Sequence, residues 1–293
     1  MKSTLVLLLL FVAVPVALIG QERNQYSQLV LVNTAEVLPH MSFSANVGTS
    51  LYTTRNSFYR GFALFGLANV IEISLSREGT IANTFGALEP ELNWALKLKV
   101  LSATDDHPAI ALRIQSSLGW NSHKVWSTDI QSFSQALYQR GLWDSHYQVS
   151  LTTFQMLASH RLGNSFSIHS NVGIQEVQSR DLWIIVAPAP SIGNGSHVAD
   201  LRHEMLLSWS LGLTHEVASQ LSLYAELQTI PALSPNIDDV KLNVNLGYLG
   251  SVAFRYLPLP AVAFDAGIVF HTSPNTTNYT EIRMGLNTVL SLQ

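Results

Sequence analysis

Apolar and polar residues alternate along most of the chain. Of all the features of the sequence, this pattern most strongly restricts the possible folds. In one segment the apolar Val252, Phe254 and Tyr256 alternate with the polar Ser251 and Arg255. A period of two residues is that of a β-strand with one apolar and one polar face. About twelve such segments follow one another between residues 41 and 292, and they predict an all-β protein.

The composition adds a second constraint. Hydrophobic residues make up 47% of the chain but charged residues only 12%, about half of the roughly 25% found in soluble proteins. After the first twenty positions, no apolar run reaches the roughly 18 residues of a transmembrane helix. The apolar residues are numerous but dispersed, which excludes a helical membrane protein and a disordered chain.

Charge, cysteine content and motifs exclude several functions. The net charge is −4 and no basic run occurs, so we expect no nucleic acid partner. The chain has no cysteine, which removes thiolate zinc sites and thiol nucleophiles. No Gly-x-Ser-x-Gly motif occurs either. We therefore expect no catalytic residues, no cofactor and no enzymatic activity.

The histidines do not predict a metal site. His203 and His215 fall on the apolar parity of their segment. His169 and His271 fall on the polar parity of segments that are distant in the chain. A histidine that packs or hydrogen-bonds is the simpler interpretation of each of them.

The N-terminus predicts export from the cytoplasm. Lys2 precedes an apolar block that ends at Gly20, and polar residues follow, as in a secretory signal peptide. An uncleaved anchor helix is the alternative. We assign residues 1–20 to the signal peptide, residues 21–39 to an N-terminal periplasmic extension and residues 40–293 to a single β-domain.

The connectors alternate in length. Short ones are expected near residues 67–69, 104–107, 161–164, 216–220 and 257–260, and long ones at 78–90, 121–144, 180–200 and 230–238. Tight turns at one end and long loops at the other predict a transmembrane up-and-down antiparallel β-barrel of about twelve strands, with short periplasmic turns and long extracellular loops. The alternative is a secreted β-sandwich with its charged face in water.

Charged residues gather on the parity opposite the apolar one. In a membrane barrel this parity faces the lumen, where charges either set the selectivity of a polar pore or pair with one another and fill the barrel. Both interpretations stay open. The candidate lumen charges are Glu72, Lys97, Lys99, Arg113, Arg202, Glu204, Glu226, Lys241, Arg255, Asp265, Glu281 and Arg283.

Aromatic residues in the expected loop 121–144 are a further candidate site. Trp126, Tyr138 and Trp143 could stack on sugar rings, fold inward as a constriction, or pack on the barrel rim.

Several short stretches resemble outer-membrane barrels of Gram-negative bacteria. Gly-Leu-Ala-Asn-Val-Ile-Glu-Ile at residues 66–73 and Ala-Ser-His-Arg-Leu-Gly-Asn-Ser-Phe-Ser-Ile-His at residues 158–169 resemble their periplasmic turns. His-Pro-Ala-Ile-Ala-Leu at residues 107–112 resembles a strand of the exopolysaccharide-associated YjbH-like group. One departure is the C-terminus, which ends in Gln293 where such barrels usually end in an aromatic residue. The resemblance, which extends to porin- and transporter-like barrels, implies an outer-membrane location and no catalytic residues.

These observations lead to one expected function and one alternative. The expected function is a passive channel or an export protein for small polar solutes or saccharides, whose identity the sequence leaves unknown. The alternative is a non-conducting structural or adhesive barrel whose extracellular loops bind a partner. The expected partners are outer-membrane lipid, periplasmic chaperones and the barrel-insertion machinery.

Overall fold

The computed structural model describes residues 28–52, 57–82, 91–104, 106–126, 142–185, 196–236, 241–259, 261–272 and 279–291. The predicted signal peptide at residues 1–20 lies outside the described residues. All regular structure in the described part of the chain is β-strand. Accordingly, no helix there is long and apolar enough to cross a bilayer.

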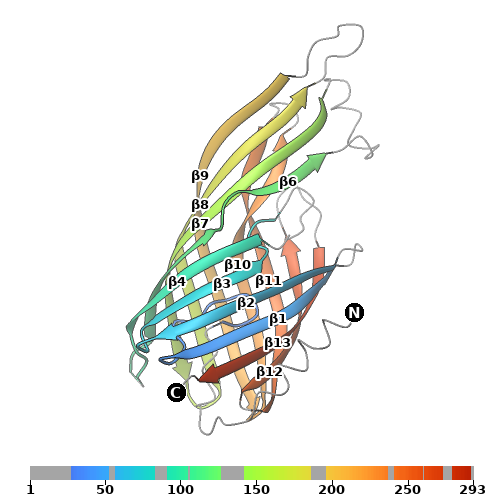
Figure 1. The fold of residues 1–293 in the computed structure, drawn as a ribbon. Helices are drawn as coiled ribbons and strands as arrows, with labels where there is room; N and C mark the ends of the chain where they lie inside the picture. Colours follow the sequence, from blue (N-terminus) through green and yellow to red (C-terminus); the bar gives the residue numbers. More distant parts are fainter. Residues whose placement is uncertain are drawn as a thin grey trace.

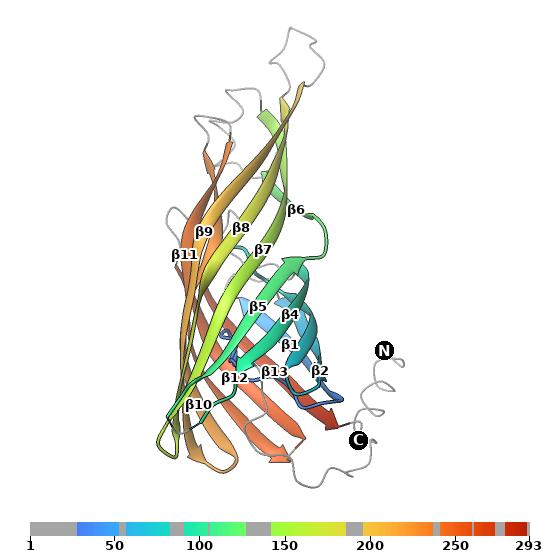
Figure 2. The same cartoon turned by 90° about the vertical axis from the view of Figure 1, so that its left-hand side faces the viewer.

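Strands of 6 to 23 residues form one antiparallel sheet (Figures 1 and 2). They are β1 Ser42–Tyr52, β2 Ser57–Leu67, β3 Ile71–Glu78, β4 Glu91–Leu101, β5 Ala109–Ser117, β6 Asn121–Trp126, β7 Leu142–Leu162, β8 Phe166–Ile185, β9 Ser196–Ala218, β10 Leu221–Asn236, β11 Lys241–Leu259, β12 Val262–Thr272 and β13 Tyr279–Ser291.

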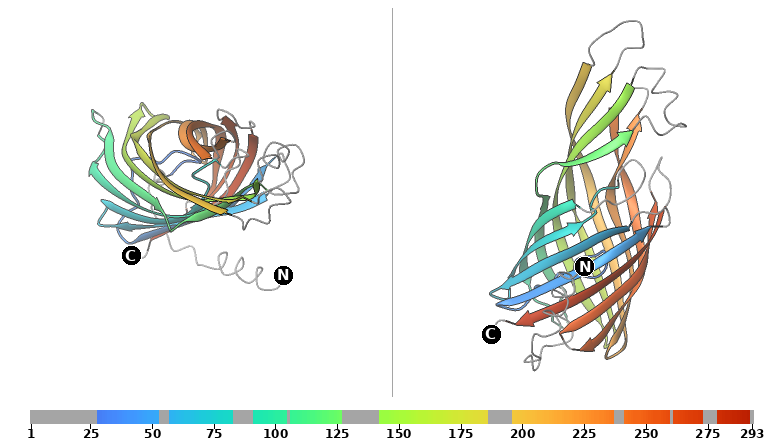
Figure 3. Two further views of the ribbon diagram at one scale, coloured as in Figure 1. Left: turned by 90° about the horizontal axis from the view of Figure 1, so that it is seen from above. Right: turned by 45° about the vertical axis from the view of Figure 1, so that its right-hand side comes forward.

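The sheet closes on itself. β1 pairs with β13, and β5 pairs with the part of β7 near the short turns, so the strands form a ring (Figure 3, left). β6 pairs with β7 farther along, from Asn121 opposite Val149, and therefore continues the line of β5 after a break at residues 118–120. With β5 and β6 counted as one interrupted strand, the protein is a closed barrel of 12 strands, which confirms the predicted fold class.

The outer surface is apolar, as the alternation predicts, and it is here called the apolar belt. Every strand from β3 to β5 and from β7 to β13 places exposed large apolar side chains on the outside, while the opposite parity is buried. Water would oppose so much exposed apolar surface, whereas the hydrocarbon of a bilayer accommodates it. Examples from around the ring are Leu75, Leu96, Leu112, Met156, Val172, Leu207, Leu223, Val252, Ile268 and Leu286.

Two details of the predicted parity are wrong. Val149 and Leu151 of β7 point inward and pack on Val177, although their apolar character suggested the lipid face. The β7 to β8 register is continuous through Phe154 and Met156, so the parity change there comes from the sequence and not from a bulge. Leu233 of β10 also belongs to this buried cluster, so the inward side chains are covered by apolar groups.

The strands next to the expected long loops extend into them. β7 begins at Leu142, within the expected loop 121–144, and β8 and β9 take residues 180–185 and 196–200 of the expected loop 180–200. β10 likewise continues to Asn236, through most of the expected loop 230–238. Strands that rise beyond the bilayer no longer need an apolar outer face, so no period of two marks them.

The short turns lie where they are predicted. Between β2 and β3, Ala68 and Asn69 have φ angles of 54° and 60°, as in the two-residue turns that favour tight hairpins. Between β7 and β8 the chain reverses at Gly163, which has a φ of 69°. Both turns belong to the stretches that resemble outer-membrane barrels. They lie at the end of the barrel where β1 begins and β13 ends.

Candidate functional site: the barrel interior

A segment that is not part of the wall lies inside the barrel. Residues 28–39, here called the plug, precede β1, and most of their side chains are buried. The sequence assigned this stretch to a periplasmic extension, and the structure places it in the lumen. Residues 29–32 form a tight reversal, in which the Leu29 N–H donates to the Val32 carbonyl over 2.9 Å.

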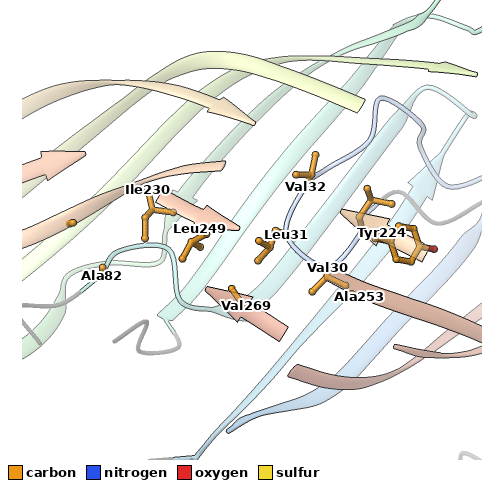
Figure 4. Close-up of a cluster of buried hydrophobic side chains, with 11 residues drawn as sticks. Val30, Leu31, Val32, Ala82, Tyr224, Ile230, Leu249, Ala253 and Val269 are labelled. Carbon is orange, nitrogen blue, oxygen red and sulfur yellow. The ribbon is translucent and has the colours of Figure 1, made fainter. Parts of the chain in front are cut away.

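Apolar side chains hold one end of the plug against the wall. Val30, Leu31 and Val32 lie among side chains of β10, β11 and β12 (Figure 4). In Figure 4 the wall contributes Tyr224 and Ile230 of β10, Leu249 and Ala253 of β11 and Val269 of β12.

Glu226 of β10 holds the plug backbone. Its Oε1 accepts hydrogen bonds from the N–H groups of Leu31 at 3.0 Å and of Val32 at 2.9 Å. Its other oxygen accepts from the Ser251 hydroxyl at 2.5 Å. A buried carboxylate is costly unless hydrogen bonds replace its hydration. The plug therefore supplies two of the donors that make this wall charge tolerable.

A second set of contacts holds the other end of the plug. The Ser159 hydroxyl accepts from the Ala35 N–H at 2.8 Å, and Glu72 Oε2 accepts from the Leu38 N–H at 3.1 Å. Glu72 also forms an ion pair of 3.0 Å with Lys97. Glu226, Ser159 and Glu72 of the wall thus accept hydrogen bonds from N–H groups at three separate points along the plug.

Two predicted lumen charges, Arg255 of β11 and Asp265 of β12, belong to a row of hydrogen-bonded side chains. Arg255 Nε and Nη2 lie 2.7 and 2.9 Å from the two carboxylate oxygens of Asp265. Asn287 donates to the same Asp265, and Asn46 donates to Asn287 over 2.7 Å. The row crosses the inner wall from β11 to β1, and Arg255 also donates to the plug carbonyl of residue 28 at 3.3 Å.

A second cluster lies nearer the opposite end of the barrel. Glu281 binds Arg283 through contacts of 2.7 and 3.2 Å. Glu281 also lies 3.2 Å from His271 Nε2. The Tyr52 ring is buried and contacts the His271 ring from inside the barrel.

The remaining candidate charges differ in their surroundings. Lys99 lies 3.6 Å from Glu36 of the plug, and Arg113 donates to the Gln155 side chain at 3.4 Å. On β9, farther from the short turns, Arg202 is half-buried and Glu204 is exposed. Lys241 is the first residue of β11, and the structure describes its backbone but not its side chain.

The structure does not show the three predicted aromatic residues together in a loop within the described part of the chain. Trp126 ends β6 and Trp143 lies at the start of β7, so both belong to strands. Tyr138 lies outside the described residues. The hypothesis that these residues bind sugar rings stays a prediction.

Two cavities flank the plug. The larger, here called the vestibule, has a volume of about 620 Å³ at the short-turn end and is lined by Glu36, Lys99, His169, Glu216 and Arg255, among others. The smaller, here called the chamber, has about 80 Å³ and lies on the other side of Val30 and Leu31. Arg113, Gln155, Gln175, Ser208 and Gln228 line the chamber. Its wall is polar, and the space suits a few water molecules or one small polar solute.

The sequence analysis missed the plug and the amides of the chamber. The apolar stretch 29–32, directly after a polar one, was the available signal, because an exposed apolar segment would be unfavourable in the periplasm. The glutamines of the chamber could not be recognised from the sequence, because uncharged polar residues at alternating positions are compatible with any strand face that contacts water. Within the described residues no group of histidines and carboxylates could hold a metal ion.

Comparison with known proteins shows only the barrel architecture. No family model and no curated protein matches the chain. Among solved structures, the NanC porin is 8% identical, covers 83% of this chain and 98% of its own, and has a TM-score of 0.46. The toluene transporter TodX of Pseudomonas putida is 9% identical, covers 85% and 88%, and has a TM-score of 0.41. OmpT of Vibrio cholerae is 9% identical, covers 87% and 100%, and has a TM-score of 0.38.

The expectation that the chain is not an enzyme has to be corrected. The barrels that match include OmpT of Vibrio cholerae besides porins and transporters, and their names do not share one activity. An identity of 9% relates the folds and nothing more. A barrel fold excludes no activity, so the fold gives no ground for that expectation.

Proposed function

We propose that the protein is an outer-membrane channel that is closed at rest by its own N-terminal segment. One observation carries the proposal: backbone N–H groups of the plug satisfy buried wall carboxylates, Glu226 above all. Withdrawal of the plug would leave these carboxylates in need of new partners, and water is the available one. The same step that removes the plug therefore favours a hydrated lumen.

The cavities support a path along the barrel axis. The vestibule lies on one side of the plug and the chamber on the other, and both have polar and charged linings. Hydrogen bonds, ion pairs and apolar packing hold the plug between them, with no covalent link, because the chain has no cysteine. Removal of the plug would join the two spaces into one polar passage.

The lining indicates small polar solutes. Amide side chains such as Gln155 and Gln228 and hydroxyls such as Ser208 bind hydroxyl groups, while Arg113 adds a cation. Small saccharides and other hydrophilic molecules fit this chemistry. We further propose that the apolar belt contacts outer-membrane lipid, and that a signal peptide, periplasmic chaperones and the barrel-insertion machinery deliver the chain there.

The second candidate is a non-conducting barrel that presents its long strands to a partner. The filled lumen and the extension of β7, β8 and β9 beyond the belt favour it. The two candidates differ in one property, which is whether the plug can leave.

Single-channel recording in planar bilayers separates them. We expect the full chain to be mostly silent and Glu226→Ala to produce discrete conductance steps, because the variant lacks the acceptor of the Leu31 and Val32 N–H groups. Glu204→Ala, which removes an exposed charge of the same type, is the matched control and should stay silent. A Glu226→Ala barrel that is correctly inserted yet silent would instead support the structural role.

A further inference from the structure

The barrel wall has a break between β9 and β10. Their ladder runs from Leu221 opposite Ala218 to Gln228 opposite Ser210, and no further pair of these strands occurs in the described residues. Both strands continue beyond that point. β9 stays paired with β8 as far as Ser196, and β10 stays paired with β11 as far as Asn236. We call this gap the seam.

A side chain replaces the backbone at the start of the seam. Thr229 Oγ1 accepts a hydrogen bond from the Trp209 N–H at 2.9 Å and lies 3.2 Å from the Trp209 carbonyl oxygen. In a continuous ladder the backbone of Thr229 would make these contacts. The threonine side chain therefore lies between the two strands at the point where they separate.

The sequence of β10 prevents the seam from closing as a ladder. Beyond Gln228, the N–H groups that face away from β11 belong to odd-numbered residues, as the hydrogen bonds of Leu233 and the Pro231 carbonyl show. Proline occupies positions 231 and 235, so two of the donors of this edge, on either side of Leu233, are missing. Prolines in such positions are a known means of keeping a strand edge unpaired.

A segment from elsewhere in the chain satisfies what remains of this edge. The Ala82 N–H donates to the Pro231 carbonyl at 2.9 Å, and the Leu233 N–H donates to the Ala82 carbonyl at 2.9 Å. Ala82 thus forms a parallel bridge with Ala232. Residues 79–82, here called the gate segment, follow β3 and extend into the lumen, where Ala82 packs in the same cluster as Val30 and Leu31 of the plug (Figure 4).

The two sides of the seam overlap. Leu233 and Val244 belong to the outward parity of β10 and β11, yet Leu233 packs with Val149 and Val177 of the inward parity of β7 and β8. The unpaired edge of β10 therefore lies on the lumen side of the edge of β9. Ile81 of the gate segment is buried in the same cluster, so the gate segment also holds this overlap closed.

The chamber ends at the seam. Ser208, Ser210, Gln228 and Thr229, which line the chamber, are the residues on either side of the point where the ladder stops. Gly79 and Thr80 of the gate segment line it as well. A polar space inside the barrel thus adjoins a place where two neighbouring strands both continue without backbone hydrogen bonds between them.

We propose that the seam between β9 and β10 is the extracellular exit of the lumen and that the gate segment is its gate. This inference rests on the proposed channel function and adds a second barrier to it. The plug closes the passage on the side of the short turns. The gate segment closes the chamber where β9 and β10 diverge, and separation of Leu233 from Val177 opens the exit.

A disulfide across the gate tests the proposal. The chain has no cysteine, so Ala82→Cys with Ala232→Cys creates a single possible pair, at two positions that face each other in the bridge. Crosslinking is scored by gel mobility with and without reductant. Flux of a small polyol, glycerol, is measured in proteoliposomes with the full chain that also carries Glu226→Ala.

We expect oxidation to form the crosslink and abolish glycerol flux, and reduction to restore it. Ala225→Cys with Val252→Cys, a facing pair in the intact ladder on the lipid side, is the control and should crosslink without a change in flux. A crosslinked gate with unchanged flux would place the exit elsewhere. Failure of the pair to crosslink in the otherwise unmodified chain would overturn the position of the gate segment.

The outcome also distinguishes the two proposals. If the reduced Glu226→Ala protein carries no glycerol although the gate pair crosslinks, the channel function fails, and the exit fails with it. If that protein carries glycerol and the oxidised pair does not stop it, only the exit fails.

Discussion

Glu72 of β3 and Lys97 of β4 face each other across the ladder and form an ion pair of 3.0 Å inside the barrel. Both side chains are almost completely buried. Each also binds the plug, Glu72 through the Leu38 N–H and Lys97 through the carbonyl of Thr34. Stability of the wall and closure of the lumen therefore depend on the same pair.

Lys97→Met should destabilise the barrel by about 3–5 kcal/mol, because it leaves the Glu72 carboxylate buried without its cation. The free energy of unfolding, measured by urea titration in lipid vesicles, checks this value. Lys97→Met together with Glu72→Met should restore most of the loss. A double variant as unstable as the single one would contradict the ion-pair explanation.

The apolar belt predicts a depth-dependent cost for charge. Val252→Arg places a cation on the outer face of β11, where the side chain is 62% exposed, and should cost about 2–4 kcal/mol if this position is near the bilayer midplane. Leu201→Arg on β9 is the control, since Leu201 is 55% exposed but lies far along the strand from the short turns. Equal costs would contradict our placement of the bilayer.

Gly66 predicts a specific way to release the plug. A Cβ atom at this position would meet the carbonyl oxygens of Leu38 and Pro39, so Gly66→Ala should push the end of the plug off the wall. We expect faster proteolysis of the plug and more frequent conductance steps. Gly250→Ala is the control, because its Cβ would meet nothing closer than 3.8 Å. An unchanged rate of proteolysis would show that the plug adapts.

Arg113 should influence which ions pass once the plug has been released. It lines the chamber, and its side chain donates to Gln155. In the Glu226→Ala background, Arg113→Gln should shift the reversal potential in a salt gradient toward cation selectivity, because a fixed positive charge is lost. Arg202→Gln, farther along β9, serves as the comparison. A reversal potential that Arg113→Gln does not move would mean that the path avoids the chamber.

The fold was predictable because one face of each strand has to be apolar within the bilayer. The alternation of Val252, Phe254 and Tyr256 follows directly from this requirement. Where the requirement ends, the pattern ends too, and the ends of β7, β8 and β9 within residues 121–144 and 180–200 were therefore interpreted as loops. The sequence had no means to show that these strands continue in water.

The interior was predictable only in part. Glu281 and Arg283 were expected to share a face because they are two residues apart, and the structure shows them paired. The contact of Glu226 with Leu31 joins residues 195 positions apart, and no local pattern indicates it. Pro231 and Pro235 were treated as loop residues, but they lie in β10, where each removes an N–H donor from the edge of the strand. This role can be recognised only when the neighbouring strand is known.

The wall holds the plug mainly through main-chain N–H groups, at Leu31, Val32, Ala35 and Leu38. Such groups are the same in every residue except proline. The lumen is thus a receptor for backbone N–H groups that are flanked by small or apolar side chains. The plug sequence can vary widely within that limit, and a separate peptide of the same character could compete for its place and open or block the barrel from the periplasm.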